Sequence, residues 1–130
     1  MANRSTDWLR QAEADLEHAR HSRSAGDYDW SCFASHQAAE KALKGVMLGR
    51  SAEAWGHSVT RLVAMLNEVD VSVSESLIDA GRLLDRHYIP TRYPDNLPEG
   101  APTDFYRVGD ADEAIHAAEM ILAHCRNQAR

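Results

Sequence analysis

The sequence predicts an all-α protein, an antiparallel up-and-down bundle of four main helices with a fifth helix added. Three observations support this fold class. Apolar residues recur at helical spacing in five stretches, no stretch alternates convincingly as a strand would, and most connections between the stretches are short. The chain has 130 residues, of which 44% are hydrophobic and 26% charged. That length can bury a core, so we expect residues 1–130 to form one domain.

The first helix should begin at Ser5 or Thr6 and end near Arg23. Its apolar stripe has spacings of three, four and three residues, at Leu9, Ala12, Leu16 and Ala19. A short break at residues 25–27 contains a glycine and should reverse the chain. The next helix is therefore expected to run antiparallel to the first.

That second helix, Tyr28–Leu48, is the central one, because apolar residues cover most of its surface. Its predicted buried side consists of Cys32, Ala39, Ala42, Leu43 and Val46. A second face carries a polar stripe within about 100° of arc, which follows Trp30 and Phe33 and consists of Gln37, Glu40, Lys41 and Lys44. The stripe is either a solvated strip or the lining of a groove for a ligand or partner.

A third helix should follow His57, and a fourth should open near Ser74 and end at Pro90. The third would bury Val59, Leu62, Val63, Leu66 and Val69. The fourth places Gly81 in its apolar seam, where glycine costs about 1 kcal/mol relative to alanine. Close approach of a neighbouring backbone would explain a glycine at this position.

A proline-rich loop at about residues 89–109 should connect the fourth helix to the last one. Loops of this length in compact domains are usually functional or disordered. Asp110 and Glu113 have the spacing of a capping box and predict the start of the last helix. The expected buried side of that helix is Ala114, Ile115, Ala118, Ile121, Leu122 and Cys125.

The net charge of −6 argues against non-specific, charge-driven binding to nucleic acid. Two segments, residues 36–50 and 82–94, nevertheless each sum to +2 and would attract an anion. Cys32 and Cys125 lie on predicted apolar faces and are expected to be buried thiols. The chain shows neither a long apolar span nor a charged-then-apolar leader, so we expect a cytoplasmic protein without a membrane segment.

Several common kinds of catalytic and cofactor site have no motif in this sequence. It contains no glycine-rich phosphate loop, no GxSxG, no HExxH and no CxxC. The histidine pairs on the first and last helices lack the accompanying ligands of a metal site. We therefore expect neither a bound metal nor a cofactor.

The most unusual stretch is residues 82–95, RLLDRHYIPTRYPD. It gathers three arginines, one histidine and two tyrosines where a helix meets a proline-fixed turn. Arginine suits phosphate and tyrosine suits stacking on a base. The alternative is a helix end whose cations complement the helix dipole, with tyrosines that pack the loop.

Taken together, several motifs resemble the HEPN domain family (higher eukaryotes and prokaryotes nucleotide-binding), in its prokaryotic stand-alone branch. They are ADLEHAR, GDYDWSCFASHQAAEKALKG, WGHS and LDRHYIPTRYPD. The resemblance covers nearly the whole chain and implies a helical bundle that usually dimerises. It also implies association with nucleotides or RNA, and a minimal nucleotidyltransferase partner in toxin–antitoxin or nucleotide-handling pairs. By motif position it assigns functional residues to His36, Gln37, Glu40, Lys41, Lys44, Gly56, His57, Tyr88, Pro90, Thr91, Arg92, Tyr93, Pro94 and Asp95.

We therefore expect a homodimer that binds a nucleotide or an RNA end. Lys41, Lys44 and Arg92 would hold phosphate, and Tyr93 or Tyr88 would stack on the base. The side chains that would orient polar groups are Gln37, Glu40 and His57.

Two alternatives remain open from the sequence. Other HEPN proteins resemble metal-independent ribonucleases with an arginine and a histidine at the spacing of Arg82 and His87, and two copies of that pair meet across a dimer. In a regular helix, however, those two side chains would point about 140° apart. The third possibility is a purely structural protein-interaction module, whose polar stripe meets another protein.

Overall fold

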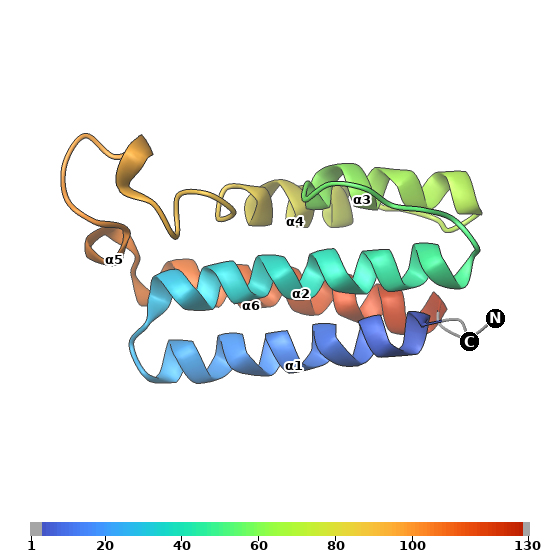
Figure 1. The fold of residues 1–130 in the computed structure, drawn as a ribbon, viewed down its shortest axis with the longest axis horizontal. Helices are drawn as coiled ribbons and strands as arrows, with labels where there is room; N and C mark the ends of the chain where they lie inside the picture. The colour runs from blue at the N-terminus through green and yellow to red at the C-terminus, as the bar shows by residue number, and fades with distance from the viewer. Residues whose placement is uncertain (1–3, 129–130) are drawn as a thin grey trace.

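The computed structural model describes residues 4–128, and within them it contains helices and no strand. The expected all-helical fold class is confirmed (Figure 1). In chain order the elements are α1 (Ser5–Ser24), α2 (Tyr28–Gly49), α3 (Val59–Met65), the 3₁₀ turn η1 (Leu66–Val69), α4 (Glu75–Asp85), the 3₁₀ turn η2 (Pro94–Asn96), α5 (Pro102–Phe105) and α6 (Val108–Gln128).

Helix α2 is the centre of the bundle, as its sequence predicted. It contacts α1, α3, α4, α5 and α6. Figure 1 shows α1, α2 and α6 running side by side along the long axis, with α3 and α4 as a further layer over α2. All five residues of the predicted apolar side of α2 are buried in the common core.

The pairing of α3 with α4 depends on Gly81. A Cβ atom at this position would lie 3.0 Å from both Cα and N of Thr60 on α3. Real Cβ atoms very rarely come that close to a backbone, so only glycine fits without a shift of one helix. The predicted close approach at Gly81 is confirmed.

The connection between α2 and α3 returns over α2 before α3 begins (Figure 1). Ser58 caps α3 by accepting a hydrogen bond from the N–H of Arg61, and Ser74 caps α4 in the same way through Leu77. This return brings the residues just before α3 against the middle of α2.

Helix α4 ends at Asp85, earlier than the expected end near Pro90. The N–H of His87 bonds to the carbonyl of Leu84, which tightens the chain into a turn. Pro90 also biases the residue before it away from helical geometry. The side chains of residues 86–92 therefore do not point in the directions that a continued helix would give them.

The segment between α4 and α6 begins and ends earlier than a loop at 89–109 and is more structured than expected. It contains η2 and α5, and α6 begins at Val108. Asp110 lies within α6 and its Oδ2 accepts from the N–H of Arg107, at 2.9 Å. Asp110 is therefore the third residue of α6, and its side chain bonds back to the residue before the helix. The expectation that Asp110 is the N-cap of a capping box with Glu113 was wrong.

Both cysteines are buried free thiols, as predicted. Burial raises the pKa of Cys32 to about 12 and that of Cys125 to about 12. At neutral pH they therefore remain protonated, unreactive components of the core.

Candidate functional site

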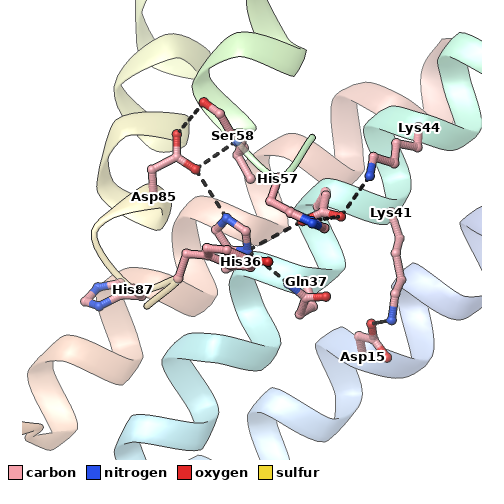
Figure 2. A network of polar contacts seen from close by, with 12 residues as sticks. Asp15, His36, Gln37, Lys41, Lys44, His57, Ser58, Asp85 and His87 are labelled. Carbon is pink, nitrogen blue, oxygen red and sulfur yellow. Dashed lines mark hydrogen bonds and ion pairs between the residues drawn. The ribbon is translucent and has the colours of Figure 1, made fainter. Parts of the chain in front are cut away.

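A contact between a buried histidine and a partly exposed carboxylate joins three helices. His36 is completely buried on α2, and its Nε2 lies 3.2 Å from Oδ1 of Asp85, the last residue of α4. The same carboxylate accepts from the backbone N–H groups of Val59 and Thr60 and from the hydroxyls of Ser58 and Thr60. Asp85 therefore caps α3 and holds it against α2 and α4 (Figure 2).

The charge of Asp85 is maintained by these contacts. Burial alone would raise the pKa of Asp85, but hydrogen bonds from His36, Thr60 and Val59 outweigh burial and hold that pKa well below its usual value. Because a carboxylate only accepts, Nε2 of His36 carries the proton, while the amide of Gln37 donates to Nδ1 over 3.2 Å. Nδ1 of His36 also lies 4.0 Å from Oε1 of Glu40, so His36 lies between the two carboxylates and Gln37 contacts its outer nitrogen.

A second carboxylate, Glu40, lies one turn further along α2 and is buried. Nδ1 of His57 lies 3.2 Å from both of its oxygens, and Nζ of Lys44 donates to Oε2 over 3.0 Å. The side chain of Glu40 is 6% exposed, whereas that of His57 is 58% exposed. Glu40 therefore orients His57 at the surface and leaves its Nε2 for a ligand.

Next to this pair, rings and a guanidinium are packed against one another in what we call the Tyr88 cluster, formed by Phe33, His57, Tyr88, Arg92 and Tyr93. The rings of His57 and Tyr88 stack at 5.0 Å. The guanidinium of Arg92 lies 4.3 Å from the ring centre of Phe33, 4.8 Å from that of Tyr88 and 5.2 Å from that of Tyr93. An imidazole, a guanidinium and stacked rings thus share one surface.

The turn after α4 explains how Arg92 reaches this position. Nε and Nη2 of Arg92 donate to the carbonyl of Tyr88, at 3.0 and 2.8 Å, and the buried hydroxyl of Thr91 donates to the carbonyl of His87. These two carbonyls have lost helical partners because α4 has ended. Thr91 was predicted to contact a nucleotide, but its hydroxyl instead stabilises the turn.

Two other candidates lie away from the Tyr88 cluster. Lys41 points toward α1, where its Nζ donates to Asp15 (Figure 2). It lines a groove of about 590 Å³ over α1 together with Arg10 and Trp8. Asp95 lies in η2 and is exposed. The polar stripe of α2 is therefore divided, with Lys44 joined to the cluster through Glu40 and Lys41 directed elsewhere.

Arg82 and His87 have different neighbours in the protomer. Arg82 is exposed and pairs with Asp79 on its own helix. His87 packs edge-on against Tyr106, and burial lowers the pKa of His87. The same burial raises the pKa of Tyr106 to about 12. The two side chains that a ribonuclease mechanism would pair make no contact with each other within residues 4–128.

The sequence profile of the HEPN domain family matches residues 5–128 of the chain. The chain belongs to the HEPN domain family. This confirms the resemblance inferred from its motifs and makes it a member of a nucleotide-binding family. No curated protein sequence matches the chain significantly.

Solved structures agree with the assignment to HEPN. The protein TT1696 from Thermus thermophilus is 50% identical with a TM-score of 0.94, over 98% of this chain and 99% of that one. ST0689, an archaeal HEPN homologue, is 39% identical with a TM-score of 0.83 over the whole of both chains. The HEPN domain protein TM0613 from Thermotoga maritima is 36% identical with a TM-score of 0.75, over 93% of this chain and 95% of that one.

Sequence reasoning missed Asp85 as a member of this candidate site. Asp85 is the last residue of α4, where a negative charge interacts unfavourably with the helix dipole. That unfavourable position was the signal in the sequence that Asp85 contacts another element. Trp8 and Trp55 were likewise not named as candidates, although both indoles are exposed.

The described part of the HEPN chain offers neither a metal cluster nor a membrane segment. Residues 4–128 contain no group of three histidine, cysteine or acidic side chains that could hold a metal ion. Over the same residues, no helix is long and apolar enough to cross a bilayer.

Proposed function

We propose that this HEPN protein binds a nucleotide or an RNA end at the Tyr88 cluster. The observation that carries the proposal is the contact between His57, Tyr88 and Arg92, with Lys44 joined to them through Glu40. Cations and rings that share one surface are what phosphate and base recognition require.

Within this site Arg92 and Lys44 would contact phosphate. The hydrogen bonds of Arg92 to Tyr88 use Nε and Nη2, which leaves the Nη1 group for a phosphate oxygen. Lys44 donates to Glu40 through one of its three N–H bonds. His57 would add a further donor or acceptor through Nε2.

Of the two tyrosines named from the sequence, Tyr93 is the freer to contact the ligand. The ring of Tyr88 is already packed against His36, His57 and the guanidinium of Arg92. Tyr93 is 49% exposed, and its ring centre lies 5.2 Å from that guanidinium. We therefore assign Tyr88 to building the site and Tyr93 to contacting the ligand.

Titration of labelled nucleotides into wild type, Lys44→Ala, Arg92→Ala and Lys41→Ala tests the proposal. Lys44→Ala and Arg92→Ala should each weaken binding about tenfold, because each removes a charged contact to phosphate. Lys41→Ala is the matched control, since it lies on the same stripe but pairs with Asp15. No binding by wild type, or equal affinities in all four proteins, would contradict the proposal.

The proposal extends to partners. We propose a cytoplasmic homodimer that acts with a minimal nucleotidyltransferase in a toxin–antitoxin-like or nucleotide-handling pair; the support is membership of the HEPN family. A structural interaction module would instead co-purify with its partner even after Arg92→Ala and would bring no nucleotide.

The ribonuclease alternative has less support from the geometry. In the homodimer proposed above the pair would form between two copies, but Nδ1 of His87 is buried and its ring packs against Tyr106, whereas the side chains of the Tyr88 cluster already lie at one surface. We therefore favour a non-enzymatic binding protein.

A further inference from the structure

A cavity of about 320 Å³ lies beside the Tyr88 cluster and contains both indoles that sequence reasoning overlooked. Its walls come from α1, from the end of α2 and from the connection to α3. They are Trp8, Lys44, Leu48, Ala52, Glu53, Ala54, Trp55 and Gly56. The volume is at the lower end of the range for small-ligand pockets.

The two indoles lie on the apolar part of the cavity wall, together with Leu48, Ala52 and Ala54. Trp55 is 71% exposed and Trp8 is 38% exposed. Neither makes a ring contact with another aromatic side chain among residues 4–128. Uncovered indole faces in one cavity are suited to stacking on a flat ring.

The cavity shares Lys44 with the proposed phosphate site. Lys44 lines the cavity and also donates to Glu40, which in turn holds His57. Gly56 lines it as well and adopts a φ of +87°, so the backbone turns sharply between Trp55 and His57. A ligand whose ring lies in the cavity would have its phosphate near Lys44 and His57.

The charges in the cavity narrow the class of ligand. Glu53 lies on the wall, is exposed, and makes no ion pair or hydrogen bond with any described residue. A carboxylate there can accept hydrogen bonds from N–H groups on a base edge. The positive charge of Lys44 in the same cavity disfavours a simple cation as occupant and suits a ligand that also carries a phosphate.

We propose that this cavity is the base pocket of the site, and that it selects a nucleobase with adjacent N–H donors, as guanine has. This inference rests on the proposed nucleotide-binding function and adds the residues that recognise the base. Trp8 and Trp55 stack on the base, Glu53 accepts hydrogen bonds from the N–H groups of the base, and Lys44 contacts the phosphate.

Fluorescence titration tests the pocket, with Trp30→Phe as the starting protein. This change removes an exposed indole outside the cavity, so that Trp8 and Trp55 alone report. Guanosine 5′-monophosphate should quench the signal more strongly than uridine 5′-monophosphate, and ribose 5-phosphate should quench it little. Trp55→Ala should weaken the guanine nucleotide about tenfold and leave ribose 5-phosphate binding unchanged. Glu53→Gln should remove the preference for guanine.

The outcomes separate this inference from the proposed function. If Arg92→Ala weakens the guanine nucleotide while Trp55→Ala and Glu53→Gln do not, the nucleotide binds but its base lies elsewhere, and the base pocket is rejected. If guanosine quenches but phosphate adds no affinity, the pocket stands and the phosphate site is rejected. Quenching by tetramethylammonium in place of guanosine would overturn the inference and assign the cavity to a cation.

Discussion

At the scale of single residues, Asp85 shows how one side chain can link fold and site. It ends α4, caps α3 and contacts the buried His36 of α2. The residues just before the cap include His57, and those just after Asp85 include Tyr88. The mutual position of these two rings therefore depends on a carboxylate that itself lies outside the Tyr88 cluster.

Asp85→Asn is expected to reduce the free energy of unfolding by about 2–3 kcal/mol at neutral pH, because several hydrogen bonds to a charged acceptor are weakened. The pKa of Asp85 is lower in the folded protein than in the unfolded chain. Its contribution is therefore complete above the unfolded value, about 3.9, and is lost as pH falls further. Denaturant unfolding at several pH values should show the difference between wild type and variant shrinking below about pH 4.

Asp79→Asn provides a control on the same helix. Its carboxylate is 69% exposed and pairs only with the exposed Arg82, so the variant should change stability by no more than about 0.5 kcal/mol. Equal effects of the two substitutions would mean that Asp85 does not act as the structural cap described above.

The residue scale also shows where sequence reasoning stops. A helical wheel placed Lys41 and Lys44 on one stripe, which was right for their position on α2. It could not show that Asp15 on α1 engages Lys41 while the buried Glu40 engages Lys44. That distinction depends on the neighbouring helix, and no local pattern encodes it.

At the scale of elements, the contact between α3 and α4 makes a prediction about Gly81. Gly81→Ala should gain helix propensity but place a methyl group 3.0 Å from the backbone of Thr60. Overpacking against backbone costs about 1–3 kcal/mol, so the net effect should be a lower melting temperature. His57 lies just before α3, so a shift of α3 would move His57, and nucleotide affinity should fall as well.

Gly109→Ala is the matched control for this experiment. Gly109 also lies in a helix, α6, but a Cβ atom there would have no neighbour within 4 Å. The control should therefore be neutral or slightly stabilising, through helix propensity alone. Similar melting temperatures for the two alanine variants would show that the helices can separate without cost.

Element boundaries were predicted less well than the elements themselves. Apolar periodicity identified the long helices because each has a buried face, and that face produces the repeating apolar pattern in the sequence. The end of α4 was placed too late because Tyr88 continues the apolar spacing after the helix has ended at Asp85. Its ring does pack inward, against His36 and His57, but from a turn.

At the scale of the whole molecule, the all-helical fold and the HEPN family could be predicted from the sequence. Long amphipathic stretches and short connections leave few arrangements other than a bundle. The site could be predicted only in part. His57, Tyr88 and Arg92 were named and lie together, whereas the Trp8–Trp55 cavity depends on how α1 and residues 52–56 pack beside α2.

Hydrogen exchange tests where on the molecule a nucleotide binds. Addition of guanosine 5′-monophosphate should slow exchange at residues 52–60 and 87–93, because these segments surround the cavity and the Tyr88 cluster. Residues 94–101 should change little, since they are mostly exposed and contribute nothing to either. Peptide-level mass spectrometry resolves these three segments.

A competing location predicts a different pattern. The groove over α1 carries Arg4, Arg10 and Lys41 and is larger than the Trp8–Trp55 cavity. If protection appeared along residues 4–14 and was absent from both 52–60 and 87–93, the nucleotide would bind in that groove, and Arg92 would have only its structural bonds to the Tyr88 carbonyl. The cavity next to Lys44 is preferred over the larger groove because it adjoins the buried Glu40 and the surface-exposed His57. Lys44 and His57 are held by this carboxylate, which is 6% exposed, whereas the partner of Arg4 in the groove is the exposed Asp7.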